Sequence, residues 1–275
     1  MGGTSRLSDS RCVRILARAG CTVVFLLWMV APARAQLEVS QLELNLRPIS
    51  AQPVAATVVI RNPGSAPTTA QLHVEDWDRL DDGTNRFLPL GTVPGSCGAR
   101  LQVFPTSLSL LPGQAQTVRV TWTQDSTGAP TAECWSIVFV EEPPPPSRAS
   151  GVGLVVQMRT GVKVYVTPPG LRRSATIEQV ELLPGVDSGG AHRVRLAVRN
   201  DGAVHFEAQV RLEVRRPDDA VAGTMNLSNM YALPGALAVQ GVTLPVLPDG
   251  RYVVLVFVDY GAADLLAGQL EIAIP

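Results

Sequence analysis

Lysine is almost absent from this sequence. Of the 23 basic residues in the 275-residue chain, 22 are arginine, and Lys163 is the only lysine. The arginines form no basic stripe with interleaved aromatic residues, and aromatics make up only 5% of the chain. Such a stripe is the usual surface for nucleic acid, so we expect no nucleic-acid partner. Lys163 stands inside an apolar stretch, GLVVQMRTGVKVYVTPPG (153–170), and this position needs an explanation.

Long hydrophobic runs are also scarce. The apolar run CTVVFLLWMV (21–30) is too short to span a bilayer. It follows four arginines between residues 6 and 18, and it precedes Ala33-Arg34-Ala35, a small-x-small cleavage pattern. These features predict a signal peptide over residues 1–35 and export of the mature chain, with no stable membrane insertion. Removing the segment leaves 18 basic and 23 acidic residues.

Only four cysteines occur, and two of them lie in the expected signal peptide. The remaining pair, Cys97 and Cys134, is expected to form a disulfide, because an isolated pair in an oxidising compartment is usually bonded. The alternative is two free thiols. A metal site is a poorer explanation, since two cysteines without a neighbouring histidine do not complete a zinc ligand set. The sequence predicts no cofactor.

Helix signals are almost absent too, whereas strand signals recur along the whole chain. The expected strands include VAATVVIR (54–61), AQLHVEDW (70–77), TVRVTW (117–122), CWSIVFVE (134–141), HRVRLAVR (192–199), AQVRLEV (208–214), YVVLVFV (252–258) and LEIAI (270–274). Many short strands at this spacing, separated by turn signals such as NPG and LPDG, predict an all-β fold built from sandwiches. Within residues 37–46 the apolar parity shifts, so a bulge could let the first strand start on one sheet and finish on the other. The alternative is a simple irregularity at the mature N-terminus.

An internal repeat divides the mature chain in two. IRNPGSAPTTAQLHV (60–74) matches VRNDGAVHFEAQVRL (198–212) without a gap, and LPG recurs after each copy. We therefore expect two tandem Ig-like β-sandwich domains, residues 36–168 and 169–275. The boundary should fall near Pro168-Pro169-Gly170, where proline ends strand pairing.

Two motifs that could indicate other functions are better explained as turns. GVDSGG (185–190) contains the Asp-Ser-Gly-Gly of chymotrypsin-like proteases, but no matching motif surrounds any of the three histidines, and serine catalysis needs a positioned histidine and carboxylate. DWDRLDDGTN (76–85) could suggest calcium. However, Leu80 and Pro89 fall where an EF-hand needs oxygen ligands, so a hairpin turn is expected. We expect the protein not to be an enzyme.

Leu154, Val156 and Met158 alternate along the strand that contains Lys163. If this strand lies at a sheet edge, its apolar face is open to another chain, and edges of this kind invite pairing. The alternative is an ordinary buried strand from which Lys163 reaches solvent. The residues alone favour the ordinary strand.

Residues 37–168 resemble the periplasmic pilus-assembly chaperones of the chaperone–usher pathway. The pieces that carry the resemblance are LEVSQLELNL, VVIRNPGSAPTTAQLHVEDW, LQVFPTSLSLLPGQAQTVRVTW, CWSIVFVEEPPPP and GLVVQMRTGVKVYVTPPG, in this order and spacing. The remaining residues lack the usual pattern of the family's second domain and look like a general Ig-like module.

The resemblance implies a mechanism. A chaperone of this family inserts its last first-domain strand into a pilus subunit that lacks one strand, and the apolar residues of that strand match Leu154, Val156 and Met158. A lysine and a first-strand arginine bind the C-terminal carboxylate of the subunit. The lysine matches Lys163. The arginine matches either a position between Glu43 and Asn45, where no cation stands, or Arg47, which we take as the expectation.

The expected function is therefore a periplasmic chaperone that caps fimbrial subunits and delivers them to an outer-membrane usher. The alternative is an Ig-like periplasmic protein that engages a cell-surface polymer or another protein. An open strand edge could also let two copies of the chain associate.

Overall fold

The computed structural model describes residues 36–125, 128, 130–144 and 157–275. The expected signal peptide and two expected donor residues, Leu154 and Val156, lie outside these residues. Among the described residues no helix is long and apolar enough to cross a membrane. Leu37–Pro275 forms one contact unit, whose described residues form strands and one short 3-10 turn, η1 (Gly98–Arg100).

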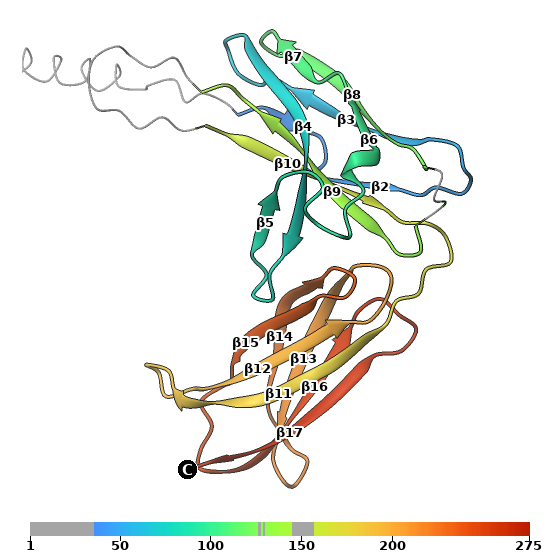
Figure 1. The fold of residues 1–275 in the computed structure, drawn as a ribbon. Helices are drawn as coiled ribbons and strands as arrows, with labels where there is room; N and C mark the ends of the chain where they lie inside the picture. Colours follow the sequence, from blue (N-terminus) through green and yellow to red (C-terminus); the bar gives the residue numbers. More distant parts are fainter. Residues whose placement is uncertain (1–35, 126–127, 129, 145–156) are drawn as a thin grey trace, which may run out of the picture. The chain divides into compact units, whose positions relative to one another are not determined.

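The first half of this unit is a sandwich of two sheets (Figure 1). One sheet has the order β1 (Glu38–Val39), β3 (Val54–Arg61), β8 (Ala115–Trp122) and β6 (Leu101–Phe104). The other has the order β2 (Glu43–Leu46), β10 (Arg159–Val166), β9 (Cys134–Glu141), β4 (Thr68–Arg79) and β5 (Asn85–Leu88), with β7 (Ser107–Leu110) also on β4. Since β1 pairs with β3 and β2 with β10, the first strand changes sheets, as its parity shift suggests.

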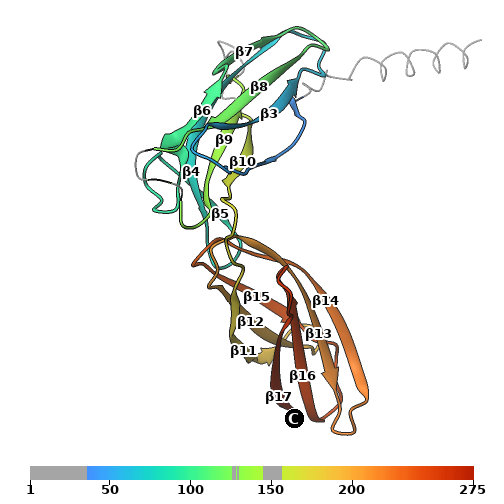
Figure 2. The same cartoon turned by 90° about the vertical axis from the view of Figure 1, so that its right-hand side faces the viewer.

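The second half is another sandwich (Figure 2). Its sheets have the orders β11 (Ala175–Val186), β12 (His192–Asn200), β15 (Leu237–Thr243) and β14 (Val221–Ala232), β13 (Phe206–Arg215), β16 (Gly250–Asp259), β17 (Leu266–Ile274). The all-β, two-sandwich fold predicted from strand spacing is confirmed. The boundary expected at Pro168–Gly170 falls in the connection between β10 and β11.

The repeat seen in the sequence corresponds to one side-chain network built twice. Asn62 directly follows β3, and Asn200 is the last residue of β12. Both side chains are buried. Each amide donates to two carbonyls and accepts one backbone N–H: Ala66, Leu110 and Gly64 for Asn62, and Val204, Ala232 and Gly202 for Asn200. Gly113 and Gly235, from the LPG that follows each copy of the repeat, also donate their N–H to the backbone carbonyls of Asn62 and Asn200. The asparagine therefore fastens the turn after its strand to the opposite sheet.

Strand β9 is buried on both faces, which explains its nearly continuous apolar sequence. Its even-numbered residues, such as Val138 and Val140, pack in the core of the first sandwich. Its odd-numbered residues Trp135, Ile137 and Phe139 belong to a second cluster on the outer face of the same sheet. That cluster includes Leu233 of the second half, so the outer face is where the two sandwiches meet.

Candidate functional site

The candidate site begins at the edge of β10. Strand β10 pairs with β9 from Arg159 to Val166, but its parallel pairing with β2 begins only at Lys163. Strand β2 therefore covers the second half of β10 alone. Met158, just before the strand, is 45% exposed. Of the three expected donor residues it is the one that the structure describes.

Lys163 lies on the outer face of this sheet, against aromatic rings. Its Nζ is 4.5 Å from the ring centroid of Trp77 on β4 and 5.2 Å from that of Tyr231 on β14. Its register partner on β2 is Glu43. Burial lowers the pKa of the Lys163 ammonium and the nearby Arg79 lowers it further, while Glu43 and Glu207 act in the opposite direction. A cation that has lost part of its hydration in this way gains from an arriving anion.

The rings around Lys163 are held by hydrogen bonds. The indole Nε1 of Trp77 donates to the carbonyl of Ser136 at 3.2 Å, and that of Trp135 donates to the carbonyl of Trp77 at 2.8 Å. The hydroxyls of Tyr165 and Tyr231 lie 2.5 Å apart and connect the two sandwiches. Lys163 therefore faces an ordered aromatic surface to which both sandwiches contribute.

A buried carboxylate fastens the sandwiches beside these rings. Glu133 is 2% exposed, yet its carboxylate accepts from the Thr167 hydroxyl at 2.6 Å and from the His205 backbone N–H at 3.0 Å. The His205 ring, paired with the same carboxylate, stacks on Tyr165 with the centroids 4.2 Å apart. This contact set fixes the position of β13 relative to β10, and through Tyr165 it supports Tyr231. Nothing in the sequence indicated it.

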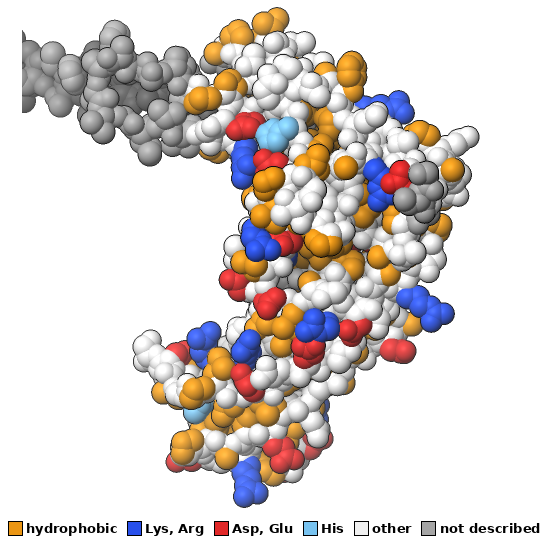
Figure 3. All heavy atoms as spheres, in the orientation of Figure 1, with side chains coloured by type: hydrophobic (Ala, Val, Ile, Leu, Met, Phe, Trp, Pro, Cys, Tyr) orange, Lys and Arg blue, Asp and Glu red, His pale blue; other side chains and the backbone are white. Residues whose placement is uncertain are grey.

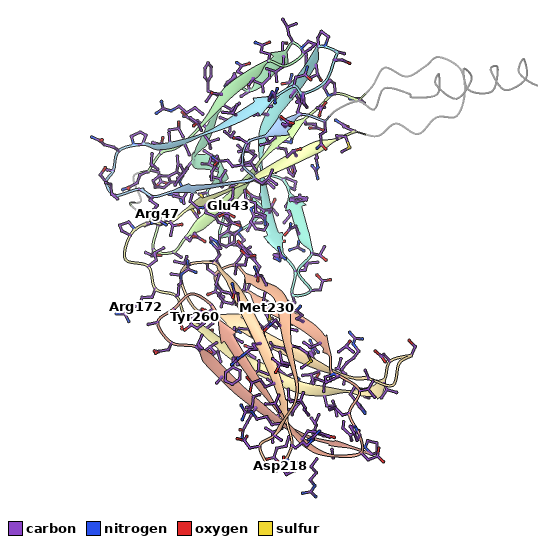
Figure 4. All side chains as sticks on the ribbon, turned by 180° about the vertical axis from the view of Figure 1, so that it is seen from behind. Glu43, Arg47, Arg172, Asp218, Met230 and Tyr260 are labelled. Carbon is purple, nitrogen blue, oxygen red and sulfur yellow. The ribbon has the colours of Figure 1, made fainter. Side chains whose placement is uncertain are left out.

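The structure does not bring Arg47 to Lys163. Arg47 follows β2 and is exposed, whereas Lys163 lies opposite Glu43, four residues earlier on that strand. Four extended residues span about 13 Å. Figure 4 labels Arg47 and Glu43 and shows them at different points along this segment. The cation that the structure does place near Lys163 is Arg79, whose Cζ is 5.0 Å from the Tyr231 ring centroid.

Sequence reasoning missed Arg79 and Tyr231. Arg79 ends β4 two residues after Trp77, so it shares a face with that ring, and strand alternation alone could have shown this. Tyr231 carries no such signal, because its contact with Lys163 depends on how the two sandwiches pack.

In Figure 3, basic and acidic side chains lie intermixed with hydrophobic ones on the visible face.

Residues 48–172 match the family model of the pili and flagellar-assembly chaperone, PapD N-terminal domain. The match covers β3 to β10 of the first sandwich and no strand of the second. The likeness to this family at the level of sequence is distant, and no curated protein matches the chain.

One solved structure with a TM-score above 0.5 shares the fold of this chain, and two others match with lower scores. A chain of a chaperone–tip adhesin complex of CFA/I fimbriae biogenesis matches with a TM-score of 0.51 at 10% identity, over 86% of this chain and 98% of that one. The class 5 fimbriae chaperone CfaA matches with a TM-score of 0.48 at 13% identity, covering 87% and 100%. A chain of the CsuC–CsuE complex of Acinetobacter baumannii gives 0.47 at 13%, covering 86% and 98%.

The two remaining cysteines of the chain are neighbours in the first sandwich. Cys97 and Cys134 are both buried, and both are present as thiols. A bridge between Ser96 and Trp135 aligns their backbones, and the Cys97 N–H donates to the Trp135 carbonyl at 3.2 Å. The Cys134 thiol and burial raise the pKa of Cys97. The disulfide stays a prediction, and the fold brings its two partners together.

The two motifs assigned to turns are turns in the structure. Asp187 of GVDSGG accepts the backbone N–H groups of Gly189 and Ala191, at 2.8 and 3.0 Å. These bonds lower the pKa of its carboxyl. DWDRLDDGTN forms the end of β4, the start of β5 and the hairpin turn between them, where Gly83 has a φ of +88°.

Proposed function

We propose that this chain is a chaperone that works in the periplasm, where it caps fimbrial subunits by donor-strand complementation and delivers them to an outer-membrane usher. The observation that carries the proposal is the pairing of β10, which β2 covers only from Lys163 onward. The segment before Lys163 can therefore offer backbone hydrogen bonds and alternate side chains to a partner strand.

The energy of capture would come from the apolar face of this segment. A subunit whose Ig-like fold lacks one strand exposes a groove, and Leu154, Val156 and Met158 have the spacing to fill it. Burying each of these side chains contributes about 1.5–3 kcal/mol. Inserting a strand in this way needs no catalytic group. When the subunit is transferred at the usher, a strand of the next subunit would replace the chaperone strand.

Lys163 would set the register of the captured strand. Its ammonium lies on the outer face of the sheet, where burial already disfavours the unpaired charge. The C-terminal carboxylate of a subunit would offset this cost and would fix where the subunit strand begins. Lys is suited to the position because a compact ammonium fits between two rings where a planar guanidinium is broad.

Some of the similar solved structures are complexes with a fimbrial subunit, and this supports a subunit as the partner of this chain. The matching chains include one from a chaperone–tip adhesin complex and one from a complex of the SafA pilin with the SafB chaperone. The test is co-expression with candidate fimbrial subunits and pull-down from periplasm. We expect the wild-type chaperone to capture a subunit, and we expect substitutions in the segment before Lys163 to abolish this capture. Capture of a cell-surface polymer instead would favour the Ig-like binding protein.

A further inference from the structure

We propose that Arg79 is a second cation of the site at Lys163, and that the two charges together bind the C-terminal carboxylate of a subunit. The inference rests on the proposed function, because it names how the same site holds its anion. In this proposal the second positive charge of the site comes from Arg79 on β4, whereas the sequence led us to expect it from Arg47.

Both cations lie against one ring. The Cζ of Arg79 is 5.0 Å from the centroid of Tyr231, and the Nζ of Lys163 is 5.2 Å from it. Arg79 also shares a strand face with Trp77, the other ring that Lys163 contacts. Two like charges this close repel each other, and the repulsion contributes to the lowered pKa of Lys163. A carboxylate bound near both would relieve it.

The acidic residues that act on Lys163 favour a second cation beside it. Glu43 and Glu207 both act on Lys163 electrostatically, and both are exposed. Each accepts a hydrogen bond from a neutral amide, of Asn45 at 2.9 Å and of Asn229 at 2.7 Å. With Lys163 alone, two carboxylates would outnumber the cation, and an arriving anion would be repelled. Arg79 adds a second positive charge beside Lys163, and Asp82 of the hairpin turn interacts electrostatically with Arg79.

Arg79 has unused donor capacity. In the described part of the chain its Nε is buried without a hydrogen-bond partner. Its Nη1 donates to Asn85, an uncharged side chain, at 3.2 Å, and no ion pair among the described residues includes Arg79. An unsatisfied buried donor is costly, and a carboxylate is its best acceptor.

Space for a ligand lies next to Arg79. A cavity of about 190 Å³ is lined by Arg79, Asp81 and Asp82 on one side and by Met230 and Tyr231 of β14 on the other. It reaches Lys163 only through the shared ring of Tyr231, since Lys163 itself does not line it. Figure 4 labels Met230 at the end of the second sandwich that faces the first. The last residues of a bound strand could enter here without displacing the core.

The unique lysine makes the first test direct. Mature chaperone labelled with [¹³C]lysine gives one lysine resonance, so a pH titration by NMR reports the pKa of Lys163 alone. We expect Arg79→Gln to raise this pKa by at least half a unit, since a like charge is removed. The matched control, Arg47→Gln, should leave it unchanged. An unchanged pKa in Arg79→Gln would overturn the proximity of the two charges.

The second test measures the contribution of the carboxylate. A 12-residue peptide of alternating valine and threonine, N-acetylated, is made with a free C-terminus and with a C-terminal amide. We expect the wild-type chaperone to prefer the free acid, and Arg79→Gln to reduce this preference at least fivefold. Arg79→Lys should keep most of it. Asn85→Ala removes the hydrogen bond from Arg79 to the hairpin and should leave the preference intact, which separates charge from hairpin structure.

The outcomes distinguish this inference from the proposed function. If Lys163→Gln abolishes the preference and Arg79→Gln does not change it, Arg79 is not part of the site, while the carboxylate anchor stands. If wild-type chaperone binds acid and amide equally, the anchor itself fails, and the inference fails with it.

Discussion

The hydroxyl groups of Tyr165 and Tyr231 lie 2.5 Å apart and join β10 to β14. Burial raises the pKa of both hydroxyls, so both stay protonated at neutral pH. Because the Tyr231 ring also contacts Lys163 and Arg79, the site is complete only while the two sandwiches keep this arrangement.

We expect the two hydroxyls to be energetically coupled. Tyr165→Phe or Tyr231→Phe should each destabilise by about 1–2 kcal/mol, since one hydroxyl is left without its partner. The double variant should cost less than the sum of the two, with a coupling of about 0.5–1.5 kcal/mol in urea unfolding. Tyr252→Phe, whose hydroxyl donates to Pro248 inside the second sandwich, is the control that should not couple to Tyr165. Strict additivity of Tyr165→Phe and Tyr231→Phe would contradict the contact.

The two repeated asparagines should be equally important. Asn62→Ala and Asn200→Ala each leave two carbonyls and one N–H without their partner, so we expect each to cost about 2–4 kcal/mol. Asn226→Ala, at an exposed position of β14, should cost less than about 0.5 kcal/mol. Thermal unfolding of the three variants checks this, and a small effect at either buried site would show that the turn does not depend on its asparagine.

Much of this fold could be predicted from local patterns. Strand alternation located most strands, and the repeated Arg-Asn-x-Gly marked the two turns that Asn62 and Asn200 fasten. The parity shift in residues 37–46 suggested the sheet change that places β2 beside β10. Each of these features depends on residues close together in the chain.

The surroundings of Lys163 could not be predicted in this way. Tyr231 is 68 residues away in the sequence and reaches Lys163 only through packing between sandwiches. Arg47 was chosen by counting positions, but the parallel register of β2 and β10 puts Glu43 opposite Lys163. Register between strands is set by tertiary structure, and a shift of a few residues moves a side chain to another site.

Cys97 and Cys134 should form a disulfide in chaperone purified from periplasm. The fold holds the two buried thiols together, and a bond closing a loop of this length would stabilise by about 3–4 kcal/mol in an entropic model. Mass spectrometry of unreduced peptides should find them linked, and reductant should lower the melting temperature. Two cysteines that are alkylated without reduction, after denaturation, would contradict this.

The donor segment should tolerate a change of size and not a charge. Val156→Asp places a carboxylate in an apolar groove, at a cost of several kcal/mol, and should abolish subunit capture. Val156→Met keeps the position apolar and should retain capture. Val186→Asp, at an exposed position of β11, controls for an added charge elsewhere and should bind as wild type does. If the Val156→Asp variant captures the subunit as well as wild type does in a periplasmic pull-down, another strand is the donor.

Lys163 should lower the stability of the free chaperone while it enables binding. Its pKa in the folded chain is below its ordinary 10.5, chiefly because of burial. Between the lowered pKa and 10.5 the unfolded chain binds the proton and the folded chain does not, so stability from this group rises with pH in that window. Below the window, the folded state bears the cost of the charge, which the two rings offset only in part.

Lys163→Met should therefore gain stability over wild type at pH 7 in urea unfolding, and this gain should shrink as the pH approaches 10. Tyrosines that titrate in the same pH range contribute equally to the unfolding free energy of both proteins, so their contribution cancels in the difference. In the same protein, affinity for a peptide with a free C-terminal carboxylate should fall at least tenfold, whereas affinity for the amide should not change. A Lys163→Met variant that is less stable than wild type at pH 7, with a deficit that shrinks only as the pH rises above 10.5, would mean that the rings favour the ammonium more than burial disfavours it. The lysine would then be a structural cation, held by Trp77 and Tyr231 for the sake of the fold.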